Sequence, residues 1–143
     1  MARYITTVRT QQQPADAFAY MADLRHFAEW VPGVKQVVQV KGDGAGAGAE
    51  FDVTVSGTTL RYVTEVYEPS TELVVVAKSR TLTSTDRVTV RTEDGSTLVT
   101  YDALLELNGL LRLADPVLRL AFGRIGDRAA AGLRRVLAGQ DVR

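Results

Sequence analysis

The sequence predicts an α+β fold in which a curved antiparallel β-sheet wraps around a long C-terminal helix, with two short helices near the N-terminus. Three observations lead to this prediction. Between residues 34 and 107, apolar and polar side chains alternate in short segments separated by turn residues. A short apolar helical pattern comes before this region, and a long amphipathic pattern follows it. We therefore expect an apolar space between the sheet and the last helix.

The composition is that of one domain with its own hydrophobic core. The 143 residues contain no linker, repeat or low-complexity block, so we expect a single domain over residues 1–143. The chain has no cysteine, which excludes disulfides, thiol nucleophiles and iron–sulfur ligation. Seventeen basic and seventeen acidic residues cancel, which leaves no overall charge to attract nucleic acid. Because the chain shows neither a signal-peptide pattern nor a run of about 18 apolar residues, we expect a cytoplasmic protein without stable membrane insertion.

The N-terminal residues predict one strand and two short helices. Arg3–Thr10 alternates as a strand does. Pro14 suits the first turn of a helix, in which Phe18 and Met21 lie on one face and which ends near Asp23. A second helical turn is expected over residues 24–30, before Pro32 and Gly33 turn the chain into the sheet.

Six further strands are expected, and the turns between them are well marked. Their approximate ranges are 34–40, 51–55, 60–66, 73–77, 88–91 and 99–107. The glycines of Gly42–Gly48 invite a phosphate-loop interpretation, but a strand follows them where such a loop needs a helix, so we expect a hairpin connection. Leu73–Ala77 is apolar on both faces, which raises the option of a homodimer that covers its outer face.

The C-terminal helix has the clearest signals of any element. Asp115 suits the N-cap and Pro116 the first helical position. One face then carries apolar residues spaced as in a helix, namely Leu118, Phe122, Ile125, Ala129, Leu133 and Val136. Residues 140–143 are expected to form a frayed tail.

Alternate residues of a strand point to the same face of the sheet, and we call residues at such alternate positions residues of one parity. The parity of the strands and the apolar face of the helix predict which side chains surround a ligand pocket. The expected pocket residues are Phe51, Val53, Val66, Val88, Val90, Val99, Ala103, Leu118, Phe122 and Ile125. Tyr62 and Tyr101 share the inward parity, and their hydroxyls could orient a ligand or donate a proton. The alternative is that both tyrosines are core residues whose hydroxyls bond to the backbone or to water.

Asp86 is the best candidate for an acid or base. It shares parity with Val88 and Val90, which would place a carboxylate on the concave face, where burial raises a carboxyl pKa toward the useful range. The alternative is that the strand starts after Asp86, or carries a bulge there, and that the side chain is solvated. His26, the single histidine, is expected to have a surface or capping role. Without cysteines or clustered ligands, we expect neither a metal nor a cofactor.

The order of elements, together with several local segments, resembles the START-like or Bet v 1-like superfamily, especially its polyketide cyclase/dehydrase and lipid-transport branch. These segments are Pro14–Asp23, Glu29–Val34, the glycine-rich turn, Tyr67-Glu68-Pro69 and Asp94–Tyr101. The resemblance implies the helix-grip fold. It also implies a family that includes aromatic polyketide cyclases, lipid carriers, plant hormone and alkaloid binders, and it transfers no catalytic residue to a definite position of this chain.

Three functions are consistent with these residues. The favoured one is binding or transport of a small hydrophobic ligand, such as a lipid or polyketide, in the pocket. The second is a cyclase or dehydratase in which Tyr62, Tyr101 or Asp86 moves a proton. The third is an interaction protein whose pocket is vestigial. Several polar groups converging in the pocket would favour the enzyme, an all-apolar lining the carrier, and a filled core the interaction protein.

Overall fold

The structure, a computed structural model, describes residues 2–109 and 115–141, without the side chains of Asp115, Leu118, Gln140 and Asp141. The elements follow the predicted order. They are β1 (Ala2–Thr10), α1 (Pro14–Ala22), the 3-10 turn η1 (Leu24–His26), α2 (Phe27–Trp30), β2 (Val34–Lys41), β3 (Glu50–Val55), β4 (Thr58–Glu68), β5 (Glu72–Lys78), β6 (Leu82–Glu93), β7 (Ser96–Leu107), α3 (Asp115–Leu137) and β8 (Gln140–Asp141).

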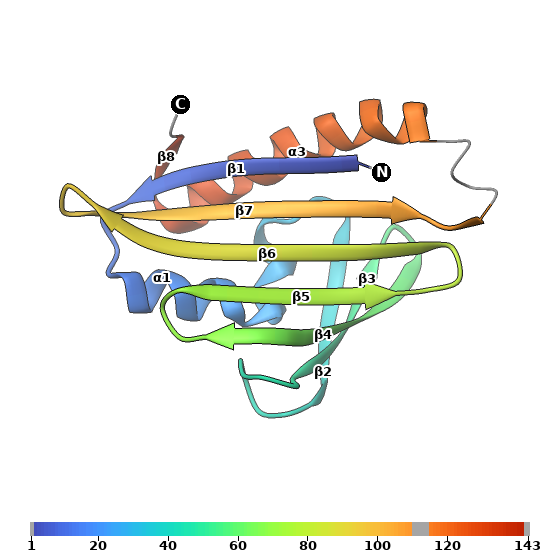
Figure 1. The fold of residues 1–143 in the computed structure, drawn as a ribbon, viewed down its shortest axis with the longest axis horizontal. Coiled ribbons are helices and arrows are strands. Elements are labelled where there is room, and N and C mark those ends of the chain that lie inside the picture. The colour runs from blue at the N-terminus through green and yellow to red at the C-terminus, as the bar shows by residue number, and fades with distance from the viewer. Residues whose placement is uncertain (1, 110–114, 142–143) are drawn as a thin grey trace.

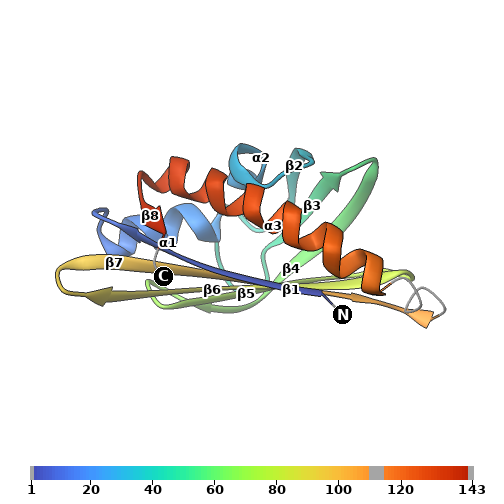
Figure 2. The same ribbon diagram turned by 90° about the horizontal axis from the view of Figure 1, so that it is seen from above.

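All the strands belong to one antiparallel sheet with the order β2-β3-β4-β5-β6-β7-β1-β8. Figure 1 shows the long strands β1, β7, β6, β5 and β4 side by side. Seen from above, α1, α2 and α3 all lie on one side of this sheet, and β2 and β3 curl toward the same side (Figure 2). The predicted α+β arrangement, a curved sheet closed over by a C-terminal helix, is confirmed.

Two glycines hold α3 close to the rest of the molecule. A Cβ atom at Gly126 would collide with the ring of Tyr4 on β1. A Cβ atom at Gly132 would lie 2.5 Å from the carbonyl oxygen of Trp30 at the end of α2. The middle of the helix therefore packs closely on the ring of Tyr4 from β1 and on the backbone at the end of α2.

A frayed tail was expected over residues 140–143, of which 142 and 143 lie outside the described residues, and the described part differs from this expectation. Residues 140 and 141 form β8, which pairs with Val8 and Arg9 of β1. The helix ends at Leu137, the following Ala138 has a left-handed φ of 51°, and the amide of Gly139 donates to the carbonyl of Arg134 at 2.8 Å. This is the Schellman geometry that commonly ends helices, and it turns the chain back toward β1.

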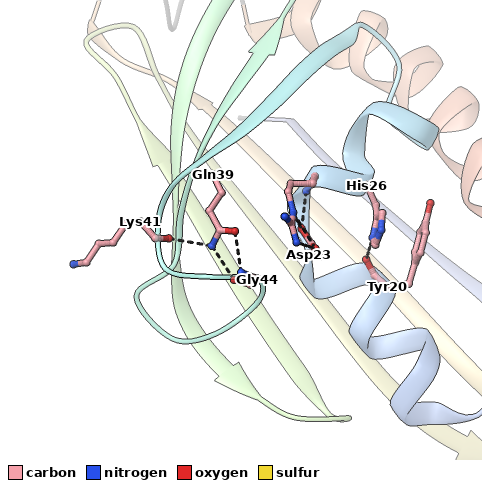
Figure 3. Close-up of polar contacts among 7 residues, drawn as sticks. Tyr20, Asp23, His26, Gln39, Lys41 and Gly44 are labelled. Carbon is pink, nitrogen blue, oxygen red and sulfur yellow. Dashed lines mark hydrogen bonds and ion pairs between the residues drawn. The ribbon is translucent and has the colours of Figure 1, made fainter.

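The glycine-rich loop connects β2 to β3 as a hairpin, and a side chain holds it in place. The amide of Gln39 donates to the carbonyls of Lys41 (3.1 Å) and Gly44 (2.9 Å) and accepts from the backbone N–H of Gly44 (2.9 Å), as Figure 3 shows. The predicted hairpin role is therefore confirmed.

The outer face of β5 is shielded within the single chain. Val74 and Val76, which point away from α3, are only 7% and 8% exposed. They are paired with Val66 and Val63 on β4 and with Arg87 and Thr85 on β6. Their burial therefore needs no partner subunit, and a homodimer stays a prediction. Among the described residues, no helix is both long and apolar enough to cross a bilayer.

Candidate functional site

A cavity of about 410 Å³ lies between the concave face of the sheet and α3. Its walls come from β1, β3, β4, β6 and β7, from the inner face of α3, and from the segment that joins α2 to β2. Most of the lining side chains that the structure describes are apolar, among them Val53, Leu60, Ala103 and Phe122. This volume lies within the range of about 300–1,000 Å³ typical of small-molecule sites.

The cavity is open to solvent at one end. Ser56, Thr58 and Thr81, from the turns at the ends of β3, β4 and β6, border it and are exposed. Ile125 on α3 also borders it and is 43% exposed. A ligand could therefore enter between these turns and α3.

Four polar side chains meet on the wall formed by β4, β6 and β7. The hydroxyl of Tyr101 donates to Oδ2 of Asp86 at 3.0 Å. The hydroxyl of Ser84 donates to Oδ1 of the same carboxylate over a longer distance of 3.4 Å, and Tyr62 in turn donates to Ser84 at 2.8 Å. All four residues border the cavity and are buried. We refer to Tyr62, Ser84, Asp86 and Tyr101 as the polar cluster.

The strand register explains why these residues meet. Ser84 and Asp86 are two apart on β6, so both side chains point to the concave face. Asp86 is paired with Ala103 on β7, which places Tyr101 two positions along that strand on the same face. Asp86 and Ala103 both border the cavity.

The polar cluster alters the acid–base properties of its members. Burial raises the pKa of Asp86 from 3.8 to about 6, the hydrogen bonds from Tyr101 and Ser84 oppose this rise, and the negative charge of Asp102 adds to it. Burial also raises the pKa of Tyr62 and of Tyr101 above the usual value, and the nearby charge of Asp86 adds to both shifts. Near neutral pH, Asp86 can therefore take up or release a proton while both tyrosines keep theirs.

Aromatic side chains from α2 pack against the rings of Tyr62 and Tyr101. The rings of Trp30 and Tyr101 are in edge contact, with centroids 5.0 Å apart, and Phe27 contacts Tyr62 in the same way at 6.2 Å. Trp30 and Phe27 come from α2 and are buried. The short helix thus fixes the orientation of the tyrosine rings toward Asp86.

The structure brings some of the predicted site residues to the cavity. Tyr62, Asp86 and Tyr101 border it and contact one another, directly or through Ser84. Asp86 lies within β6, which begins at Leu82, so the alternative of a solvated side chain before the strand is wrong. The predicted pocket residues that border the cavity are Val53, Ala103, Phe122 and Ile125. Leu118 lies on α3, but its side chain is outside the described part of the chain.

Five predicted pocket residues do not border the cavity. Val88, Val90 and Val99 are buried in the hydrophobic core instead, because α1 packs over β6 and β7 and fills that end of the concave face. Phe51 on β3 is also buried in the hydrophobic core. Val66 was expected to point inward, but the pairing of β4 with β5 shifts register between Thr64 and Val66. This irregularity reverses the parity of the strand, so Tyr67 takes the inward position and its ring contacts Phe18 at 5.6 Å.

Ser84 is the functional candidate that sequence reasoning missed. It lies in a run of threonines before Val88, and we expected the strand to start later. The signal was present, because Ser84, Asp86, Val88 and Val90 share one parity and threonine favours strands. Tyr4, Leu60 and Leu105 also border the cavity and share the inward parity of their strands.

His26 lies away from the cavity lining. Its ring stacks on Tyr20 with centroids 4.2 Å apart, and Nδ1 donates to the carbonyl of Tyr20 at 2.8 Å (Figure 3). The same view shows the carboxylate of Asp23, which accepts from the backbone N–H of Arg25 at the start of η1. Within the described part of the chain, no group of three or more His, Asp or Glu side chains could hold a metal ion.

Comparison with known proteins agrees with this architecture. The family model described as polyketide cyclase/dehydrase and lipid transport matches residues 1–138. A START superfamily protein from Mycobacterium smegmatis is similar in structure, with a TM-score of 0.70 and 17% identity, over 96% of this chain and 98% of that one. XoxI from Bacillus cereus is similar over 96% of both chains, with a TM-score of 0.68 and 16% identity.

The di-domain ARO/CYC StfQ from the steffimycin biosynthetic pathway is similar over 95% of this chain, with a TM-score of 0.72 and 16% identity. This chain spans about half of that protein, 49% of its length. Among curated proteins, none shows significant sequence similarity to the chain. The structural likenesses establish the fold. The family match over nearly the whole sequence establishes that the chain belongs to the polyketide cyclase/dehydrase and lipid-transport family.

Proposed function

We propose that residues 1–143 form one cytoplasmic domain that binds a small, mainly apolar molecule in the cavity under α3. The observation that carries this proposal is the cavity itself, about 410 Å³ in volume, mainly apolar and open at one end. A filled core would have favoured an interaction protein with a vestigial pocket. Family membership supports the same conclusion, because the family description includes lipid transport.

A fluorescent apolar probe tests this proposal. N-phenyl-1-naphthylamine should bind with one saturable site per chain. Ala103→Phe places a ring in the cavity and should weaken binding at least tenfold, because Ala103 borders the cavity. Ala121→Phe on the exposed face of α3 is the matched control and should leave the affinity within twofold. Absence of saturable binding, or equal affinity in a folded Ala103→Phe variant, would contradict the proposal.

A second candidate function is acid–base catalysis on the bound molecule, and the polar cluster favours it. In a cyclisation or dehydration, Asp86 would accept a proton from a carbon next to a ketone. As the carboxylate takes up that proton, the hydroxyl of Tyr101 is free to donate to the developing enolate oxygen. The distances of 3.0 Å and 3.4 Å around the carboxylate, and its pKa of about 6, are compatible with this role.

Proton exchange on a ketone separates catalysis from binding alone. In deuterated buffer, the protein should accelerate the exchange of the C1 protons of 2-tetralone, as followed by NMR. Asp86→Asn should lower this rate by about 100-fold or more with little change in 2-tetralone affinity. Asp102→Asn, which removes a carboxylate beside Tyr101 that does not border the cavity, should keep the rate. If wild-type protein binds 2-tetralone without accelerating exchange, the chain is a carrier for this class of molecule.

A further inference from the structure

The charges around the cavity are unbalanced. Among the lining residues that the structure describes, Asp86 is the single charged side chain, and arginine, lysine and histidine are absent. Asp86 is 5% exposed and keeps only hydroxyl groups as hydrogen-bond partners. A ligand carboxylate placed here would bring a second negative charge into the same buried region, with no cation to compensate it.

Within the polar cluster, all the hydroxyl groups donate their protons to other members of the cluster. An ionised carboxylate only accepts, so the single proton of Tyr101 and the single proton of Ser84 both point toward Asp86. Because the proton of Ser84 is used there, Tyr62 must donate its own proton to Ser84. Each hydroxyl proton of the cluster is thus used internally, and the lone pairs that remain are acceptors.

The cluster therefore offers a ligand hydrogen-bond acceptors and a negative charge, and it lacks a free donor. Tyr4 also borders the cavity, and its hydroxyl donates to Oδ1 of the exposed Asp127 at 3.0 Å. The remaining hydroxyls on the lining, Ser56, Thr58 and Thr81, are exposed at the open end.

We infer that the cavity selects apolar molecules that carry a hydrogen-bond donor, either a neutral hydroxyl or a protonated amine, and rejects the same skeletons when they carry a carboxylate. This inference rests on the proposed function, since it names the class of ligand that the same cavity takes. The donor group would lie against Asp86 and the oxygens of Tyr62 and Tyr101, and the apolar skeleton against Val53, Leu60 and Phe122.

A matched series of naphthalenes provides the test. The compounds are 2-methylnaphthalene, 2-naphthylmethanol, 2-naphthylmethylamine and 2-naphthoate, and their dissociation constants would be measured at pH 7.5 by displacement of N-phenyl-1-naphthylamine or by calorimetry. The alcohol should bind at least tenfold more tightly than 2-naphthoate, and the amine at least as tightly as the alcohol.

Substitution of the carboxylate shows whether it causes the selection. In Asp86→Asn the side chain is neutral and its amide offers a donor. The ratio of the affinity for 2-naphthylmethylamine to the affinity for 2-naphthoate should therefore fall at least tenfold. Asp102→Asn removes one negative charge from the opposite face of β7 and should leave this ratio within twofold. Tyr101→Phe serves as a second variant of the cluster. It removes one acceptor oxygen, and the alcohol should lose affinity relative to 2-methylnaphthalene.

Three results would overturn the ligand selection, its assignment to the polar cluster, or the proposed binding function. If 2-naphthoate binds as tightly as the alcohol or more tightly while 2-methylnaphthalene also binds, the selection is wrong and the hydrophobic binding function stands. If the selection is observed but is unchanged in a folded Asp86→Asn variant, its assignment to the polar cluster is overturned. If none of the four compounds binds at a saturable site, both the selection and the proposed function fail.

Discussion

Asp86 is the residue that links the cavity to the stability of the fold. Burial lifts its pKa from 3.8 to about 6, so the folded state holds this proton more tightly than the unfolded state does. The stabilising effect of the proton is complete below about pH 3.8 and is lost as the pH rises through about 6. A shift of this size corresponds to roughly 3 kcal/mol. The polar side chains that face this carboxyl are Tyr62, Ser84 and Tyr101, and Asp102 is the other charged group that acts on it.

We predict that Asp86→Asn removes this pH dependence. Urea unfolding at pH 4 and at pH 8 should show that the stability difference between variant and wild type moves by roughly 2.5 kcal/mol in favour of the variant at the higher pH. The reason is that asparagine carries no charge to be desolvated. Asp102→Asn should not produce this change. An equal difference between Asp86→Asn and wild type at both pH values would mean that the carboxylate is solvated.

At the scale of elements, α3 depends on its close contact with α2. In Gly132→Ala the new methyl group would meet the backbone of Trp30, which cannot move as a flexible side chain could. We predict a loss of about 1–3 kcal/mol in the free energy of unfolding. Gly123→Ala is the matched control on the same helix, because no atom lies within 4 Å of the added Cβ atom.

The control substitution should change the free energy of unfolding in the opposite direction. Alanine favours a helix over glycine by about 1 kcal/mol, so Gly123→Ala should stabilise the protein by about 0.5–1 kcal/mol. Thermal and urea unfolding of both variants would measure these differences. If both substitutions shift stability equally, α3 does not rest on α2 in the way described.

The elements also show which parts of the structure can be predicted from the sequence. Pro116 and the apolar spacing that follows predict α3 because they depend on local geometry alone. The inward position of Asp86 could be predicted because strand parity carries through a regular strand. Val66 was misplaced because a register shift leaves no mark in the alternation of β4. The core position of Val88 could not be foreseen, since it depends on where α1 packs along the sheet.

At the scale of the whole molecule, we predict that no metal takes part in ligand binding. The chain has no cysteine and one histidine, and the described residues form no cluster of metal ligands. Exhaustive dialysis against a chelator should leave the affinity for N-phenyl-1-naphthylamine unchanged. Loss of binding that a divalent metal restores, together with a stoichiometric metal ion in elemental analysis, would show that this prediction is wrong.

A crystal structure of the complex with 2-naphthylmethanol would show whether the ligand binds in the cavity and contacts the polar cluster. The ring system should lie under α3 against Val53, Leu60 and Phe122, with the ligand oxygen within hydrogen-bonding distance of Asp86, Tyr62 or Tyr101. Electron density for the ligand elsewhere on the surface, with the cavity free of it, would show that the cavity under α3 is not the binding site.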